Sequence, residues 1–127
     1  MRLLKMLLVL FVCAATPVSA GPFEDARAAY DRGDYATALR LWRPLADQGN
    51  PGAQYNLGGM YASNRGVSQG VPHDLVQAYK WFSLAASRFK KNDHREMAIK
   101  ARNLVATAMT PARIAEAQKL AREWKPR

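Results

Sequence analysis

An internal repeat is the feature of this sequence that most constrains its fold. Shifting the chain by 40 residues superimposes two sets of small and bulky apolar residues: Ala38, Leu41, Trp42, Leu45 and Ala46 on Ala78, Trp81, Phe82, Ala85 and Ala86. The spacings within each set predict amphipathic helices, and a period of roughly 35–45 residues is typical of solenoids built from helix pairs. A single helical hairpin of this kind cannot bury its apolar face alone, so the copies are expected to stack.

The second copy, residues 53–86, shows how each hairpin is built. Its two halves have helical spacing, and the glycines and Pro72 between them exclude one continuous helix. Asp74 is placed to cap the second helix, as Asp34 is in the first copy. Each glycine in a helix costs about 1 kcal/mol relative to alanine, so Gly58 is expected to lie where a neighbouring helix approaches closely. A phosphate-binding glycine loop is the alternative, but no strand precedes it and no Gly-Lys-Ser/Thr follows.

Small, aromatic and glycine positions recur together along the chain: Gly33-Asp34-Tyr35, Ala38, Trp42, Pro44-Leu45-Ala46, Gln48-Gly49, Ala53-Gln54-Tyr55, Leu57-Gly58, Met60-Tyr61, Gly70-Val71, Asp74 and Ala78-Tyr79-Lys80-Trp81-Phe82. Together they resemble the Sel-one-like repeat, a relative of the tetratricopeptide repeat. The resemblance covers roughly Phe23 to Trp124 and implies an all-α, right-handed solenoid of about three antiparallel helical hairpins. Repeats are expected at about 23–52 and 53–88. The connection departs from the family pattern, because residues 63–69 are a few too many.

The last part of the chain, residues 92–125, departs from the repeat and is expected to form a closing hairpin, as terminal units of solenoids do. Asp93 and Glu96 have the spacing of a capping box, and Thr110-Pro111 is typical of a helix start. Apolar residues at helical spacing predict an inner stripe on each helix: Met97, Ala101, Leu104 and Ala108 on the first, and Ile114, Ala117, Ala121 and Trp124 on the second.

Residues 1–20 have the pattern of a bacterial export signal. Arg2 and Lys5 precede an apolar run, and Val18-Ser19-Ala20 is a small-residue cleavage site. The run is shorter than the roughly 20 residues that span a membrane, although an uncleaved anchor is the alternative. Val12 before Cys13 disfavours a lipoprotein. Cleavage after Ala20 is expected to leave a periplasmic or secreted domain, residues 21–127, without cysteine and therefore without a disulfide.

The sequence indicates no catalytic, metal or cofactor site. His73 lies in a loop and His94 near a helix start, and a zinc site shared by them would need a further ligand. Ser87-Arg88-Phe89-Lys90 matches Ser-x-x-Lys, but the partner motifs of the β-lactamases are missing. The tryptophans and tyrosines are interpreted as core, although Tyr55 and Tyr79 could reach the surface.

Charge is divided unevenly along the chain. Residues 21–79 carry five Arg or Lys and six Asp or Glu, whereas residues 80–127 carry twelve and four. A basic half favours an acidic partner, and an exported chain is not expected to meet nucleic acid. The candidate partner-binding residues are Arg88, Lys90, Lys91 and Arg95, which cluster between the second and third hairpins. The alternative is that they form ordinary solvated surface.

The resemblance implies a non-catalytic protein–protein interaction module, here an adaptor of the bacterial cell envelope that binds a protein or peptide. Two other functions stay open on the residues alone. One is an envelope hydrolase acting on the cell wall or on β-lactams, and the other is a protein that binds an anionic membrane surface and detaches in salt.

Overall fold

The computed structural model describes residues 20–127, so the predicted export signal lies, apart from Ala20, outside the described residues. The described chain contains six α-helices and one short 3-10 helix, and no strand. The helices are α1 (Pro22–Asp31), α2 (Tyr35–Asp47), α3 (Pro51–Ala62), η1 (Val67–Gln69), α4 (Leu75–Arg88), α5 (Asn92–Ala106) and α6 (Pro111–Glu123).

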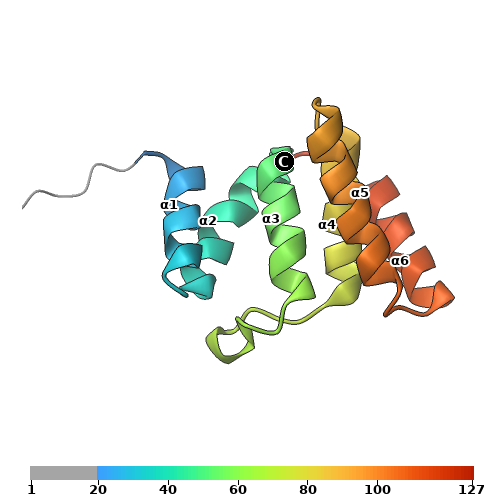
Figure 1. Cartoon of the computed structure of the whole chain (residues 1–127), viewed down its shortest axis with the longest axis horizontal. Helices are drawn as coiled ribbons and strands as arrows, with labels where there is room; N and C mark the ends of the chain where they lie inside the picture. The colour runs from blue at the N-terminus through green and yellow to red at the C-terminus, as the bar shows by residue number, and fades with distance from the viewer. Residues whose placement is uncertain (1–19) are drawn as a thin grey trace, which may run out of the picture.

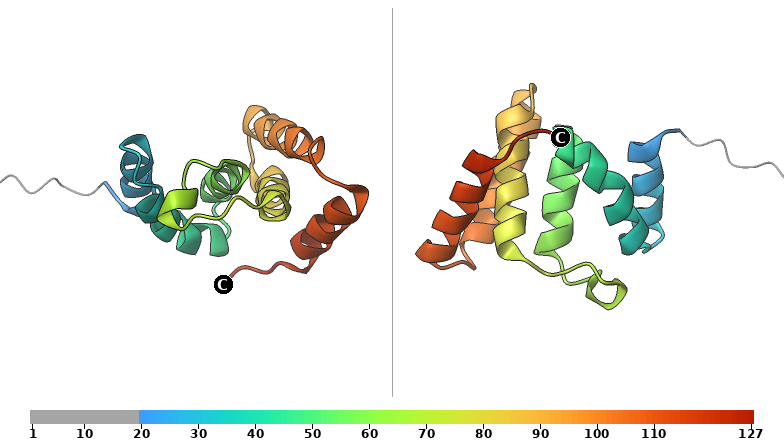
Figure 2. Two further views of the ribbon diagram at one scale, coloured as in Figure 1. Left: turned by 90° about the horizontal axis from the view of Figure 1, so that it is seen from below. Right: turned by 180° about the vertical axis from the view of Figure 1, so that it is seen from behind.

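Neighbouring helices pack side by side from one end of the molecule to the other. α1 packs on α2, α2 on α3 and α3 on α4 (Figure 1). Beyond that point α5 and α6 both pack on α4, on two different sides of it (Figure 2, left). The all-α fold predicted from the repeat is confirmed, and the arrangement is consistent with a helical repeat solenoid.

Side-chain caps begin the helices where the sequence predicts them. Asp34 accepts a hydrogen bond from the Thr37 N–H at 3.2 Å, and Asp74 accepts one from the Gln77 N–H at 3.1 Å. Thr110 caps α6 in the same way. Each cap satisfies a backbone donor that the first turn of a helix leaves free, which typically stabilises by about 1 kcal/mol.

The core is formed by large side chains of α2, α3 and α4 together with alanines. Trp42, Leu57 and Trp81 are fully buried, and alanines at helical spacing allow the helices to approach each other. Gly58 lies against α4, as predicted from its place in the helix. A Cβ atom added there would lie 2.8 Å from the ring of Phe82.

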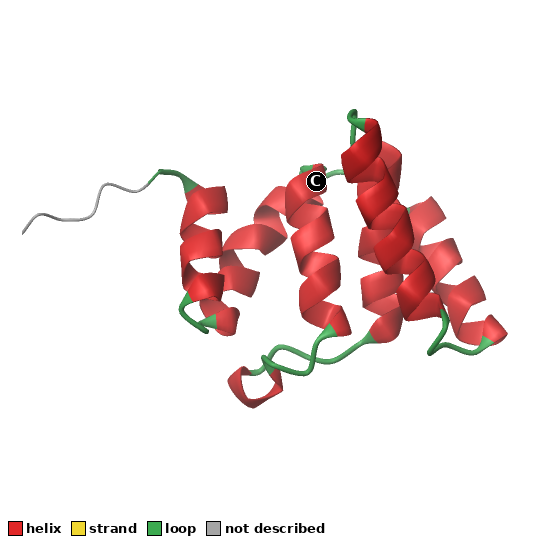
Figure 3. Cartoon of the chain, viewed as in Figure 1, coloured by secondary structure: helices red, strands yellow, loops and turns green. Residues whose placement is uncertain are grey.

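The long connection between α3 and α4 folds back on the first hairpin (Figure 3). The Gln69 side chain accepts hydrogen bonds from the N–H groups of Tyr35 and Ala36, at 2.8 and 3.1 Å, and donates one to the Gly33 carbonyl at 2.8 Å. Val71, two residues further along the connection, is buried in the core. The extra residues of this connection therefore form a second cap for α2 and join the two repeats.

Replacing Gln69 with alanine is expected to lower the free energy of unfolding by about 1–2 kcal/mol, because two N–H groups at the start of α2 lose their acceptor. Chemical denaturation followed by circular dichroism measures this. Ser68→Ala, an exposed change in the same 3-10 helix, is the matched control. Equal midpoints for the two variants would show that the connection does not stabilise the first hairpin.

The predicted inner stripe of α5 is confirmed at Ala101, which packs against the core, and is wrong at Met97, Leu104 and Ala108, which are exposed. Met97 and Leu104 are exposed, by 45% and 73%, whereas Ala98 and Val105 are buried. The buried face is displaced by one position because α5 packs closely on α4, and a small residue at position 98 permits that approach. Larger apolar side chains are left in solvent.

The predicted capping box of α5 is also wrong. The helix begins at Asn92 with Lys91 as its N-cap, so Asp93 lies inside the first turn. Its carboxylate accepts a hydrogen bond from the adjacent His94 N–H at 3.0 Å. In that position Asp93 complements the positive end of the helix dipole without capping it.

Candidate partner-binding site

The predicted basic residues lie where α4 ends and α5 begins. Arg88, Lys90 and Lys91 line a shallow recess of about 560 Å³ together with Phe89 and His94. Gly49, between α2 and α3, and Pro51, the first residue of α3, complete its lining. Arg95 is in the first turns of α5 and does not line the recess. The structure thus brings three of the four candidates together.

Two of the four candidate residues, Arg88 and Arg95, already make contacts within the described structure. The Arg88 guanidinium lies 4.8 Å from the ring centroid of Trp124, and it also lies beside Gly49, whose lack of a side chain gives it space. Arg95 donates hydrogen bonds from Nε and Nη2 to the Phe89 carbonyl, at 3.3 and 3.0 Å. Both side chains therefore hold the end of α4 and are less available to a partner.

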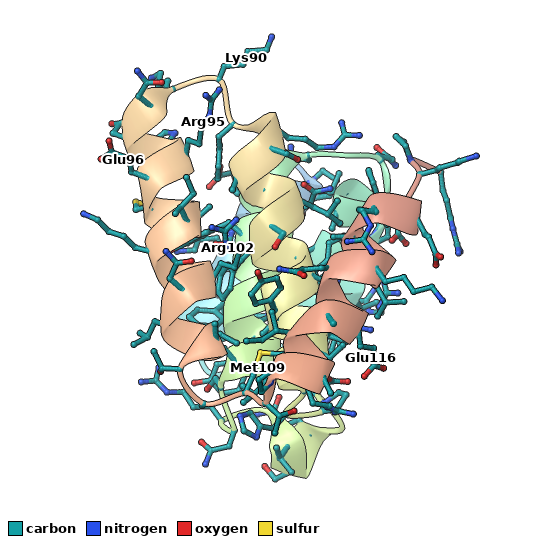
Figure 4. The ribbon with its side chains drawn as sticks, turned by 90° about the vertical axis from the view of Figure 1, so that its right-hand side faces the viewer. Lys90, Arg95, Glu96, Arg102, Met109 and Glu116 are labelled. Carbon is teal, nitrogen blue, oxygen red and sulfur yellow. The ribbon has the colours of Figure 1, made fainter. Side chains whose placement is uncertain are left out.

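Lys90 and Lys91 are exposed, and among the described residues neither has an ion-pair partner. Figure 4 shows Lys90 on the connector between the two helices, pointing away from the molecule. Two lysines next to each other on an exposed turn raise the local positive potential, and a nearby carboxylate is needed to offset it.

The acidic residues of the basic half do not supply that neutralisation. Glu116 lies 3.5 Å from Arg113 and Glu123 lies 4.0 Å from Lys119, both on α6. Asp93 and Glu96 of α5 form no ion pair among the described residues, and these two carboxylates are outnumbered by the four neighbouring cations Arg88, Lys90, Lys91 and Arg95. Positive charge on the α4–α5 side of the described structure is therefore in excess.

A second recess, which the sequence did not indicate as a site, lies between α1 and α3. Tyr30 and Arg27 form one wall, Tyr55 and Asn56 form the other, and the volume is about 260 Å³. Trp42 and Phe82 also line it. Tyr55 and Asn56 are both half-buried, and no local sequence pattern indicated that they face Arg27 and Tyr30 of α1.

The two tyrosines that could have reached the surface behave differently. Tyr55 is half-buried and contacts the Phe82 ring at a centroid distance of 5.4 Å. Tyr79 is buried, and its hydroxyl accepts a hydrogen bond from Gln118 at 3.3 Å. Only Tyr55 offers its ring to a recess.

The two histidines are separated by the whole of α4, which is 14 residues long and therefore about 21 Å in length. His73 precedes the helix and His94 follows it, where its ring contacts Phe89. Within residues 20–127 no three His, Cys, Asp or Glu side chains lie close enough to hold a metal ion. The Ser87 hydroxyl donates a hydrogen bond to the Leu84 carbonyl of its own helix, at 2.8 Å.

None of the helices in the described part of the chain is long and apolar enough to cross a membrane.

Comparison with known proteins supports the repeat interpretation. The family model of the Sel1 repeat matches residues 26–50 and 51–88, which correspond to α1–α2 and α3–α4. No curated protein and no solved structure matches the chain. Sel1 repeats generally mediate protein–protein interaction. The family model matches two repeats, and each matched repeat corresponds to one helical hairpin of the structure. The chain therefore belongs to the Sel1 repeat family.

Proposed function

We propose that this chain is a non-catalytic adaptor of the bacterial cell envelope that binds an acidic segment of a partner protein. The observation that carries the proposal is the excess positive charge at the α4–α5 turn of a Sel1 repeat domain. Lys90 and Lys91 supply the accessible charge there, and Arg88 forms the wall of the adjoining recess.

The physical argument for an acidic partner is electrostatic. An exposed cluster of cations accelerates encounter with an acidic surface and disfavours basic ones, and it contributes more to the association rate than to affinity. A flexible lysine on a turn suits this role because it adapts to different carboxylate positions. The recess beside it provides a surface for an apolar or aromatic side chain of the same segment, through Phe89 and Pro51.

The non-catalytic part of the proposal is supported by the bonding of Ser87, the serine of the Ser-x-x-Lys match. The Ser87 hydroxyl donates to a carbonyl of its own helix, and no hydrogen bond joins it to a histidine among the described residues. General-base activation requires such a neighbour within hydrogen-bond reach. The cationic Lys90, three residues away, is exposed on the turn.

Crosslinking of envelope proteins in living cells, followed by affinity purification of this chain, identifies the partner. Reversing Lys90 and Lys91 to glutamate is then expected to slow association and to flatten its dependence on salt. Helical content and the unfolding midpoint are expected to change little, because neither lysine side chain forms a hydrogen bond or an ion pair among the described residues. Stopped-flow or surface-based kinetics at two salt concentrations measures both effects.

Arg40→Glu with Arg65→Glu is a matched control for this prediction, because it makes the same change of net charge on exposed residues of the other half of the chain. A smaller effect on association is expected for the control. If both double variants associate equally fast, Lys90 and Lys91 are ordinary solvated surface and the proposed docking surface is rejected.

Export is part of the proposal and is tested independently of the partner. The charged start, the apolar run and the Val18-Ser19-Ala20 end support cleavage after Ala20. N-terminal sequencing of the protein from the cell envelope is expected to begin at Gly21. A chain that begins at Met1, or that carries lipid on Cys13, contradicts the proposal.

A further inference from the structure

The last residues of the chain cross back over the helical stack. After α6 the chain runs towards α2, where the Arg127 N–H donates a hydrogen bond to the Asp47 carbonyl at 2.8 Å (Figure 2). Residues 123–127 thereby close a pocket of about 310 Å³ against Arg43 and Asp47 of α2 and Lys80 and Trp81 of α4. Lys90 and Lys91 do not line this pocket, so it is distinct from the proposed partner surface.

Cationic groups converge in this pocket around one aromatic ring. The Lys80 ammonium lies 4.2 Å from the ring centroid of Trp81, and the Arg43 guanidinium lies 5.6 Å from the same centroid. The Tyr61 hydroxyl accepts a hydrogen bond from Arg43 at 3.1 Å, which fixes the guanidinium in place. Arg127 is brought to the same pocket by its bond to Asp47.

Of the two side-chain carboxylates that line the pocket, Asp47 pairs with the pocket's own Arg43, and Glu123 pairs with a lysine outside it. Asp47 lies 3.4 Å from Arg43, and Glu123 lies 4.0 Å from Lys119, which is outside the pocket. Lys80 and Arg127 have no ion-pair partner within residues 20–127. Positive charges held together without a counter-ion are unfavourable, particularly where they are partly withdrawn from water.

The effect of this crowding is strongest on Lys80. Burial, and after it the nearby Arg43, lowers the pKa of the Lys80 ammonium to about 8, and Arg127 acts in the same direction. The carboxylates of Asp47 and Asp74 oppose the shift but do not cancel it. A bound anion would offset the repulsion and would return the pKa of Lys80 towards its ordinary value.

We propose that the pocket between α2, α4 and the tail binds a doubly charged tetrahedral oxyanion of the phosphate-ester class, with Arg43, Lys80 and Arg127 as its contacts. Arginine presents paired N–H donors that match phosphate oxygens, and lysine adds a compact charge. The volume is at the lower end of small-molecule sites, which suits a small ester.

Sulfate is the first probe, because it is a tetrahedral dianion that does not titrate near neutral pH. Isothermal titration calorimetry at pH 8, in two buffers of different ionisation enthalpy, measures binding and the protons exchanged. Binding is expected to be accompanied by uptake of up to about half a proton, since roughly half of the Lys80 side chains are neutral at that pH. Absence of any sulfate binding overturns the proposal.

Two variants test whether sulfate binds at the proposed contacts, and a third serves as a control. Lys80→Met keeps the aliphatic length and is expected to weaken sulfate binding about tenfold and to abolish the proton uptake. Arg127→Ala removes an exposed charge without removing the backbone bond to Asp47, and it provides a second test if Lys80→Met disturbs the fold. Lys100→Met on α5 is the control and is expected to bind like the parent. Parent-like binding by both Lys80→Met and Arg127→Ala overturns the proposal.

The same chemistry could be presented by a soluble ester or by a lipid headgroup, and two further arms distinguish these sources. Glycerol 3-phosphate represents the soluble ester, and vesicles containing phosphatidic acid represent the headgroup. The probe that binds to the parent but not to Lys80→Met or Arg127→Ala shows which of the two, the soluble ester or the lipid headgroup, occupies the pocket. Sulfate binding without binding of either ester overturns the assignment to the phosphate-ester class.

Discussion

Replacing Trp81 with alanine is expected to lower the free energy of unfolding by about 3 kcal/mol, at the lower end of the range for a buried aromatic side chain. Trp81 is 1% exposed and lies where α2, α4 and the tail meet. Its ring contacts Trp124 at a centroid distance of 6.4 Å. The loss is expected at the lower end because the indole N–H has no hydrogen-bond partner among the described residues, so its removal relieves part of the cost.

Two comparison variants test this explanation by urea denaturation. Trp81→Phe keeps a ring and removes the N–H without a partner, so it is expected to be much more stable than Trp81→Ala. Trp124→Ala truncates a tryptophan that is only half-buried and is expected to cost about 1–2 kcal/mol. Equal losses for Trp81→Ala and Trp124→Ala would mean that their shared contact, and not burial of Trp81 in the core, accounts for the effect.

The helix starts and the repeat could be predicted because they depend on short-range chemistry. Asp34, Asp74 and Thr110 each cap a helix through an N–H three residues further on, and a local sequence pattern contains that whole interaction. The helical spacing of the apolar residues around Trp42, and of those around Trp81, likewise identifies a buried face on each helix without knowledge of what covers it. Both kinds of prediction are confirmed.

The buried face of α5 could not be predicted from apolarity alone. A hydrophobicity pattern ranks Met97 and Leu104 above Ala98, but the distance between α4 and α5 decides which of them fits. That distance depends on residues of both helices. The capping box failed for a related reason, since the preceding turn places the start of α5 two residues before the position that Asp93 and Glu96 imply.

The sequence predicted which residues form the candidate partner-binding site, but it predicted their arrangement only in part. The sequence places Arg88 and Arg95 near Lys90 and Lys91, but it does not show that Arg88 stacks on Trp124, 36 residues later. The pocket beneath the tail has no local signal either. Arg43, Lys80 and Arg127 are far apart in the chain and come together only because α2 and α4 lie on the side to which the tail returns.

Replacing Gly58 with leucine is expected to lower the free energy of unfolding by about 1–3 kcal/mol through overpacking. The ring of Phe82 lies 2.8 Å from the position of an added Cβ, closer than real Cβ contacts come. Phe82 is buried and is packed against Tyr55, so its ring has little room to withdraw. Even alanine is therefore expected to destabilise at this position, although it is the better helix former.

Gly59 provides a matched control in the same helix, because a Cβ added there meets nothing within 4 Å. Gly59→Ala is expected to stabilise by up to about 1 kcal/mol through helix propensity alone. Phe82→Leu gives a second check, since the narrower side chain should reduce the cost of Gly58→Ala in the double variant. Denaturation midpoints of the single and double variants measure this coupling. If Gly58→Ala is as stable as Gly59→Ala in the parent background, the close contact between α3 and α4 at this glycine does not limit the packing of the two helices.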